Sequence, residues 1–460
     1  MARIEHDSLG EVEVPAGHWW GAQTERCRQN FPIGAGRYLW GRQVIRALGL
    51  VKKCAAQVNA GLGNLSAAKS DAIVQAAQEV MDGRWDSEFP LVIFQTGSGT
   101  QSNMNANEVI AHLANRGAAA EPVHPNDDVN RSQSSNDVFP TVMHIATVEQ
   151  VEDQLLPAMA VLRATLRQKE ARFAGIVMVG RTHLQDAAPV TLGQVVSGWG
   201  AQLDAAAAGI ANSLNGVRDL ALGGTAVGTG LNAPREFGEL AAAAISRETG
   251  KRFHPAPNKF AVLSAHDAMA AVSAALRNLA GALIKIANDV RWYACGPRAG
   301  IAELRLPANE PGSSIMPGKV NPTQCEALLQ AAVQVFGNDH AVAFAASQGN
   351  FQLNTFKPLI LYNVLESIAL LAQGCCSFEE RCMRGMEADE ANIRRHLEGS
   401  LVGAPALNPH IGYEQAAAIA LAADRQGVSL RVAALQSGAV TEAQFDEWVR
   451  LDEMAHPQPR

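Results

Sequence analysis

The chain has 460 residues, and at roughly 150 residues per domain this length suggests about three domains. Its 38 Lys and Arg against 45 Asp and Glu give a net charge of −7 without basic clusters, which argues against nucleic acid or an anionic membrane as the main partner. Apolar residues make up 47%, enough for a large core, which argues against disorder. Charged residues make up only 18%, so we expect the chain to bury much of its surface in an oligomer.

The seven cysteines are scattered, and none has the CxxC spacing of a metal or redox site, a pattern that fits a reducing compartment. The first residues are polar and lack the apolar stretch of a signal peptide. The apolar run 359–376 is interrupted by Asn363 and Glu366, so we expect no membrane span. The sequence therefore predicts a cytoplasmic protein without a bound metal or an iron–sulfur cluster.

Helical patterns dominate the chain and strand patterns are few, which predicts a mainly α fold. In chain order we expect helices over Met104–Ala114 and about 137–171, a strand over Ile176–Val179, and helices over about 191–221, 235–249, Met269–Tyr293, 322–346 and 358–385. Segments rich in Gly, Pro, Ser and Asn separate these elements, as is typical of loops.

The predicted helix Met269–Tyr293 has apolar residues spaced alternately three and four positions apart, the seam of long packed helices. Alanine and glycine on its other faces let neighbours approach closely, so we expect it to lie inside a helix bundle. The character of the chain changes near Glu390. We therefore predict an N-terminal domain (1–133), a central helical-bundle domain (134–390) and a small C-terminal helical domain (391–460).

Polar clusters stand near four predicted helix starts: Gln95–Asn103, Ser132–Asp137, Gly180–Asp186 and Pro311–Pro322. Helix capping explains any one of them, and a lone histidine such as His183 is more often a buried structural residue than a catalyst. Helix N-termini also offer unpaired N–H groups and the positive end of a dipole. Several such starts together could hold a small dianion without many basic residues.

The stretch Pro311–Pro322 is the most informative cluster. It superficially suggests a P-loop, but five residues separate Gly312 from Gly318-Lys319 where that motif needs four, and valine follows the lysine. Asn321 followed by Pro322 is typical of a helix start, with the asparagine as N-cap and the proline at the first helical position. Capping does not explain Ser313 or Lys319, which leaves them open to a role in ligand binding.

The stretch Gly312–Pro322 resembles the signature of the fumarase/aspartase superfamily, whose members eliminate a group β to a carboxylate. The resemblance covers nearly the whole chain and is closest to the class II (iron-independent) fumarate hydratases. Its other supporting stretches are Gln95–Glu108, Val123–Asp137, Gly180–Asp186, Gly223–Asn232, Asn258–Asp267, Gly349–Pro358 and Leu407–Tyr413. It implies the three-domain fold of that superfamily, with a central bundle of long helices that forms a tetrameric core.

Aspartate ammonia-lyases share the Ser313 loop, so this loop does not separate them from the hydratases. His183 stands where aspartases typically have glutamine, and Ser98–Gln101 and Asn350–Lys357 are likewise similar to fumarases. An aspartate ammonia-lyase, another lyase of the superfamily and a catalytically silent structural relative are the alternatives. The silent relative predicts erosion of the catalytic set, and Ser313, His183, Lys319 and Asn321 are all present.

The resemblance implies reversible trans hydration of fumarate to L-malate through an aci-carboxylate carbanion, without a cofactor. By resemblance Ser313 is the base, His183 is the acid–base partner, and Glu326 orients that histidine. Lys319 and Asn321 would bind the carboxylate that takes up the carbanion charge. The implied substrate-binding residues are Ser98, Gly99, Thr100, Ser134, Ser135, Asn136, Thr182, Ser314, Lys319, Val320 and Asn321. Because serine is a weak base, we also expect backbone N–H groups of residues 312–318 to point at the Ser313 oxygen.

The implied partners are a small dicarboxylate, water and further copies of the chain. The superfamily forms homotetramers whose active sites take residues from three subunits. A second dicarboxylate site is implied at His124, Pro125, Asn126 and Asp127. A polar turn explains these four residues equally well, and Glu121-Pro122 stands where the family often has basic residues.

Overall fold

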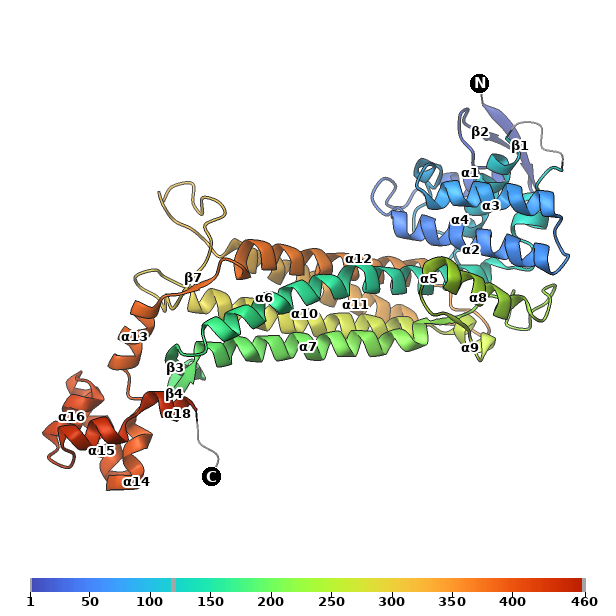
Figure 1. Cartoon of the computed structure of the whole chain (residues 1–460). Helices are drawn as coiled ribbons and strands as arrows, with labels where there is room; N and C mark the ends of the chain where they lie inside the picture. The colour runs from blue at the N-terminus through green and yellow to red at the C-terminus, as the bar shows by residue number, and fades with distance from the viewer. Residues whose placement is uncertain (1, 117–120, 457–460) are drawn as a thin grey trace. The chain divides into compact units, whose positions relative to one another are not determined.

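Helices make up most of the fold, as the computed structural model shows for residues 2–116 and 121–456, the part of the chain that it describes (Figure 1). The strands of those residues form small sheets of two strands each. The mainly α prediction is therefore confirmed. Contacts divide the chain into a first unit (Met1–Pro157, Ala208–Ala280 and Val333–Ala372) and a second unit (Ala158–Ala207, Gly281–Ala332 and Gln373–Arg460). The domain limits near 134 and 391 stay predictions.

The first unit is organised around helix α2 (Arg42–Gly61), whose apolar residues Leu48 and Leu50 are fully buried. It packs against α3 (Ala67–Met81), α5 (Ser135–Gln150) and α8 (Phe237–Thr249). The other elements of this part are the antiparallel strands β1 (Arg3–Asp7) and β2 (Gly10–Val14), and the helices α1 (Ala22–Asn30), η1 (Asp86–Glu88), α4 (Thr100–Ala114), η2 (Pro125–Val129) and α9 (Lys259–Ser264). The predicted helix Met104–Ala114 is confirmed. The elements within residues 1–95 were not predicted.

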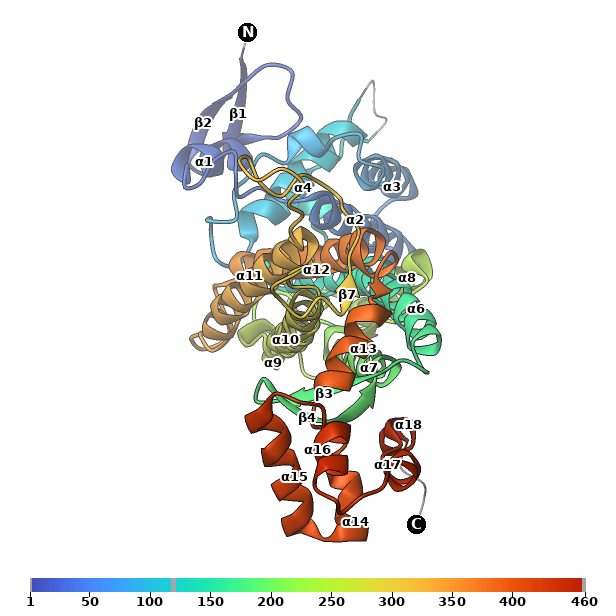
Figure 2. The same cartoon turned by 90° about the vertical axis from the view of Figure 1, so that its left-hand side faces the viewer.

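The long helices are α6 (Leu156–Arg172), α7 (Leu192–Val217), α10 (Asp267–Tyr293), α11 (Thr323–Ala346) and α12 (Lys357–Phe378). Within each unit, the parts of α7, α10, α11 and α12 that belong to it lie side by side (Figures 1 and 2). The predicted seam on α10 is buried except at its end, since Met269, Val272, Leu276, Leu279, Leu283, Ile286 and Val290 are at most 1% exposed, whereas Tyr293 is half-buried. A bundle of long helices is therefore present, and its association with other copies stays a prediction.

Two helical stretches, Asp267–Tyr293 and Lys357–Met383, are long and apolar enough to cross a membrane by length and composition alone. The apolar windows of these stretches are 44% and 50% buried inside the protein. Core helices of soluble proteins pass the same test, so these two stretches are weak evidence for a membrane span.

Two predicted helices contain an expanded π-helical turn. The segment predicted at about 137–171 is α5 and α6 joined by η3 (Val151–Leu155), and the one predicted at about 358–385 is α12 continued by η4 (Glu379–Met383). The prediction at 191–221 runs too far, because α7 ends at Val217 and Asp219–Leu220 form strand β5, which pairs with β6 (His254–Pro255).

The predicted strand at Ile176–Val179 is β3 (Val177–Thr182), which pairs with β4 (Gln185–Thr191) in an antiparallel hairpin. The sequence analysis missed β4. Thr191 and Gln194 form a capping box at the start of α7, because each side chain bonds the other residue's backbone N–H.

The last part of the second unit is built from short helices. They surround a small hydrophobic core that includes Leu407, Ile419, Leu430 and Phe445. The helical elements are α13 (Glu390–Gly399), η5 (Ala404–Leu407), α14 (Asn408–Ile411), α15 (Tyr413–Gln426), α16 (Leu430–Gln436), α17 (Glu442–Trp448) and α18 (Leu451–Ala455). Strands β7 (Leu304–Arg305) and β8 (Glu387–Ala388) precede these helices in the chain and pair with each other. The expected helical character of this region is confirmed.

Candidate active site

The start of α4 holds two hydroxyl groups against each other. Ser98 is 5% exposed, and its Oγ lies 2.7 Å from Oγ1 of Thr100. Gly99 has φ of +78°, and a Cβ there would lie 2.2 Å from Cγ of Phe139 on α5. A Cβ at Gly97 would lie 1.6 Å from the carbonyl oxygen of Thr355. Only glycine fits these two positions, so the loop packs tightly and fixes both hydroxyls at the helix start.

The start of α5 is capped as the sequence predicts. The Ser134 Oγ accepts the N–H of Asn136 at 3.2 Å, and Oδ1 of Asp137 accepts the N–H of Ser134 at 2.9 Å. Ser135 joins this start to α4, because its Oγ accepts a hydrogen bond from Nδ2 of Asn103 at 3.0 Å. Asn136 donates to the carbonyl of Ala226 at 2.8 Å. The predicted binding residues of these two clusters therefore lie together in the first unit.

Asp137 is a residue whose importance the sequence analysis missed. Its carboxylate is fully buried and accepts the N–H groups of Ser134, Gly223 and Thr225, each at 2.9 Å. Burial raises the pKa of Asp137 to about 6, against the effect of these bonds. The carboxylate ties the start of α5 to residues 223–225. An acidic residue at the third helical position was the sequence signal for such a cap.

Backbone N–H groups point at the Ser313 oxygen, as expected. The N–H of Ile315 donates to Oγ of Ser313 at 3.2 Å, and the N–H of Met316 donates at 3.0 Å. Serine also makes such bonds in ordinary turns. The loop closes on itself, because the N–H of Gly312 donates to the carbonyl of Lys319 at 2.8 Å.

The prediction that Asn321 caps the following helix is wrong. Its Nδ2 donates to the carbonyl of Gly312 at 2.7 Å, and α11 begins only at Thr323. The carbonyl of Pro322 instead accepts the first helical N–H groups, those of Cys325 and Glu326. The side chain of Asn321 therefore braces the Ser313 loop and serves no capping function.

The neighbouring predicted residues face outward. Ser314, Lys319, Val320 and Glu326 are exposed, and within residues 2–116 and 121–456 the side chains of Lys319 and Glu326 make no ion pair. These side chains are accessible to a ligand or to another protein chain.

His183 lies at the exposed tip of the β3–β4 hairpin. His183 and Leu184 form the two-residue turn, with φ of +55° and +60°. This type I′ geometry usually takes Asn or Gly, and it costs about 1–2 kcal/mol for each L-residue with a Cβ. Thr182, which precedes the turn, is also exposed.

The strand just before this turn is fixed by an ion pair that was not predicted from the sequence. Arg181 donates two hydrogen bonds of 2.8 Å to Glu303, whose side chain is 1% exposed. The same carboxylate lies 2.8 Å from Nδ1 of His396. In the described part of one chain, no hydrogen bond or ion pair joins His183 to Ser313, Lys319 or Glu326. Within one chain, His183 therefore lacks the contact with Glu326 that the resemblance implies.

The four residues of the implied second site form a self-bonded turn. Nδ1 of His124 accepts the N–H of Asp127 at 3.1 Å and lies 3.2 Å from its carboxylate. Pro125 opens the π-helical turn η2, and Asn126 is exposed. The simple polar turn explains these contacts.

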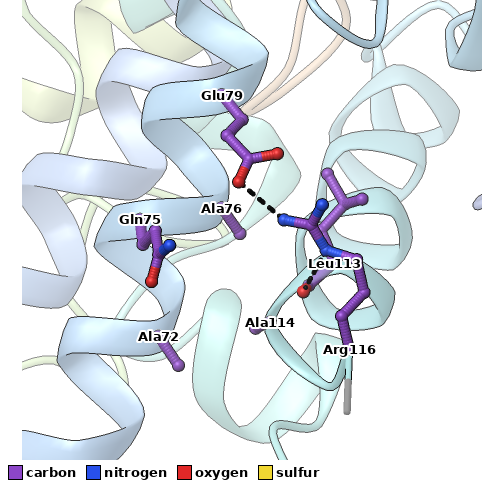
Figure 3. A pocket seen from close by; sticks show the side chains of 7 residues that line it. All are labelled: Ala72, Gln75, Ala76, Glu79, Leu113, Ala114 and Arg116. Carbon is purple, nitrogen blue, oxygen red and sulfur yellow. Dashed lines mark hydrogen bonds and ion pairs between the residues drawn. The ribbon is translucent and has the colours of Figure 1, made fainter.

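A cavity of about 350 Å³ lies between α3 and the end of α4, lined by Ala72, Gln75, Ala76, Glu79, Leu113, Ala114 and Arg116 (Figure 3). Its charged groups are paired, since Arg116 lies 2.6 Å from Glu79. None of the predicted site residues lines it, so it is separate from the polar clusters.

Comparisons with known proteins agree with these features. A family model described as Lyase matches residues 10–337, and one described as Fumarase C C-terminus matches residues 404–456. A curated relative from Pseudomonas syringae pv. tomato, named Fumarate hydratase class II, is 57% identical over 459 residues, which is 99% of this chain and 98% of the relative. A relative of the same name from Staphylococcus aureus is 54% identical over 459 residues, which is 99% of this chain and 99% of the relative. The crystal structure of recombinant class II fumarase from Schistosoma mansoni matches with a TM-score of 0.97 and 40% identity over 100% of both chains. The chain therefore belongs to the class II fumarate hydratase family and is a hydro-lyase.

Proposed function

We propose that the protein catalyses the reversible trans addition of water to fumarate, which gives L-malate. The observation that carries the proposal is the Ser313 loop, where two backbone N–H groups already point at the hydroxyl oxygen. In the reverse reaction, from L-malate to fumarate, Ser313 as an alkoxide removes the proton from the carbon next to one carboxylate. The charge spreads into that carboxylate, and an acid protonates the departing hydroxyl.

The energetics favour this use of the loop. Lowering the pKa of a serine by about 5 units requires roughly 7 kcal/mol. One ammonium at about 4 Å offers roughly 4 kcal/mol at an effective dielectric of 20. Two hydrogen bonds to a charged oxygen contribute about 1.5–3 kcal/mol each and supply the rest. Lys319, Ile315 and Met316 are the groups that we assign to this task.

The helix starts in the first unit provide the binding groups for the substrate. Dicarboxylate binding by Ser98, Gly99, Thr100, Ser134, Ser135 and Asn136 fits their shared location and the dipoles of α4 and α5. Thr182, Ser314 and Val320 complete the set that we propose to contact the substrate. Lys319 and Asn321 bind the carboxylate that takes up charge, and His183, oriented by Glu326, protonates the leaving hydroxyl through a water.

We also propose that the active sites are shared between subunits of a homotetramer in the cytoplasm. Apolar side chains on α11 form an exposed stripe at helical spacing, with Val333 63%, Phe336 42% and Phe344 65% exposed. Such a stripe is typical of a surface that another helix covers. We also propose a second dicarboxylate site at residues 124–127, where a ligand would replace the contacts between His124 and Asp127.

The experiment is the appearance of fumarate absorbance after L-malate is added to chelator-treated protein. The proposal predicts rapid formation of fumarate from L-malate and none from L-aspartate. Fumarate from L-aspartate alone would instead identify an ammonia-lyase, and no reaction with either compound would identify a silent relative.

A further inference from the structure

Lys52 of α2 is a buried lysine without a carboxylate in hydrogen-bond contact. Its side chain is fully buried, and its Nζ donates to Oδ1 of Asn130 at 3.0 Å and to Oε1 of Gln133 at 2.9 Å. Both acceptors are neutral amides, whereas a buried lysine is ordinarily paired with an acidic group. Such a charge is costly to bury, and packing alone does not explain why it is there.

The bonds of Lys52 lead directly to the candidate binding groups. Oδ1 of Asn130 also accepts Nδ2 of Asn103 at 3.1 Å, and the same nitrogen donates to Oγ of Ser135 at 3.0 Å. Gln133 immediately precedes Ser134, the cap of α5. The ammonium is therefore linked to the starts of α4 and α5 through one or two side chains.

Within the described part of the chain, two amide oxygens of this cluster have no donor. Oδ1 of Asn103 and Oδ1 of Asn107 are buried without a partner among the described residues, although the Nδ2 group of Asn107 also bonds Asn130 at 3.2 Å. The two acceptor oxygens that bond the Lys52 Nζ favour the protonated form of the amine. Burial acts in the other direction and lowers the pKa of Lys52 to about 7. The negative charge of Asp137 opposes that shift.

Other charged groups near α2 have partners of their own. Asp128 in η2 pairs with Lys69 at 2.8 Å, and Glu248 on α8 pairs with Lys53. Asp137 on α5 accepts three backbone N–H groups, and Lys259 on α9, whose pKa burial lowers to about 8, donates to two carbonyls. The charge of Asp137 acts on Lys52 without a hydrogen bond between them, and a dianion at the helix starts would add further negative charge near the ammonium.

We propose that Lys52 is a positioning residue for the dicarboxylate, which holds residues 133–136 in their binding shape and supplies buried positive charge behind them. The inference rests on the proposed function, because the ligand is its substrate. A bound dianion stabilises the ammonium, so binding takes up a proton near pH 7. The affinity is then highest at low pH and falls as the pH rises through the pKa of Lys52 in the free protein.

The test is calorimetric titration of the full-length protein with succinate, an unreactive dicarboxylate of the same chain length. Lys52→Met removes the charge and keeps the length of the side chain. We expect it to weaken succinate binding about tenfold at pH 6.5, with a smaller difference from wild type at pH 8.5. The matched control is Lys169→Met, since Lys169 is also buried but donates to the carbonyl of Met386 in the second unit. This control should bind succinate within about twofold of wild type.

Kinetics separate this role from a merely structural one. Lys52→Met should raise KM for fumarate about tenfold and change kcat less than about threefold. Should that variant fail to fold, Lys52→Gln is the replacement, because it retains an amide donor without the charge. Unchanged affinity and an unchanged pH dependence in the folded variant would overturn the inference.

Failure of the inference differs from failure of the proposed function. If wild type hydrates fumarate while Lys52→Met keeps its KM and affinity, only the inference is wrong. If wild type binds succinate through Lys52 but does not hydrate fumarate, only the proposed function is wrong. A wild-type protein that neither binds succinate nor interconverts fumarate and L-malate overturns both.

Discussion

Burial decides the charge of several side chains in the first unit. His144 on α5 is 2% exposed and donates from Nδ1 to the carbonyl of Asp219 at 2.9 Å. Burial lowers its pKa to about 4, so the folded protein keeps the ring neutral where the unfolded chain binds a proton. Folding stability therefore decreases as the pH falls from about 6.5 towards 4.

His144→Gln should remove this pH dependence. The variant keeps an amide donor for the Asp219 carbonyl but has no group that titrates. Between pH 7.5 and 4.5 the wild type should lose about 3 kcal/mol of unfolding free energy more than the variant does. Urea unfolding of both proteins at the two pH values measures the difference. Equal losses would show that His144 is protonated in the folded state.

Single residues were predictable from the sequence where a motif fixes their role. Ser134 and Thr191 are caps, as their sequence contexts predict. Asn321 has an equally good capping context, but its side chain bonds to the carbonyl of Gly312, which the closed Ser313 loop places within reach. Lys52 had no distinguishing sequence signal, since its role depends on partners that are distant in the chain, and the same holds for the bonds of Asp137 to Gly223 and Thr225.

The β3–β4 hairpin carries strain at its tip. Leu184 is 77% exposed, so its side chain gains little from burial there, yet its φ is +60°. Positive φ costs a residue with a Cβ about 1–2 kcal/mol. The ion pair between Arg181 and Glu303 fixes the chain just before the turn and helps to hold this geometry.

Leu184→Gly should stabilise the protein. Relief of positive φ outweighs the extra entropy of glycine in the unfolded chain, which gives a net gain of about 0.5–1 kcal/mol. Leu9→Gly is the matched control, because Leu9 is 81% exposed in the β1–β2 turn without positive φ. The control should lose about 0.5 kcal/mol. Chemical denaturation of both variants measures these changes, and a loss in Leu184→Gly would refute the argument from strain.

At the scale of elements, long helices were predictable and short pairings were not. The seam of α10 appears directly in the sequence because packing needs apolar residues every three or four positions. Strand β4 contains Asp186 and Pro189 and has little strand character, so only its pairing with β3 defines it. The π-helical turns η3 and η4 add one residue to a turn and leave no clear signal in the pattern.

For the whole molecule, the resemblance predicted the family and the helical fold. It did not predict how the site residues of one chain are arranged in space. The groups that we assign to catalysis include exposed side chains such as His183 and Lys319. The partners that we propose for them on other copies could not be predicted from periodicity or spacing, because association depends on surface shape. The stripe of Val333, Phe336 and Phe344 on α11 is the feature of one chain that points to such an association.

Complementation tests the shared sites. Ser313→Ala and His183→Asn should each be inactive alone. When they are co-expressed, mixed tetramers should contain sites with both intact residues and recover up to about one quarter of wild-type activity. Sites confined to one chain would always contain one defect, so no recovery would contradict the shared arrangement. Each variant co-expressed with itself is the control.

The most direct test of the account is the rate of fumarate formation from L-malate by Ser313→Ala beside wild type. The account predicts a loss of about a thousandfold or more in kcat, with the melting temperature unchanged. Ser347→Ala, which alters an exposed serine bonded to Phe344, should retain full activity. Near-normal turnover by folded Ser313→Ala would contradict the claim that this hydroxyl is the base.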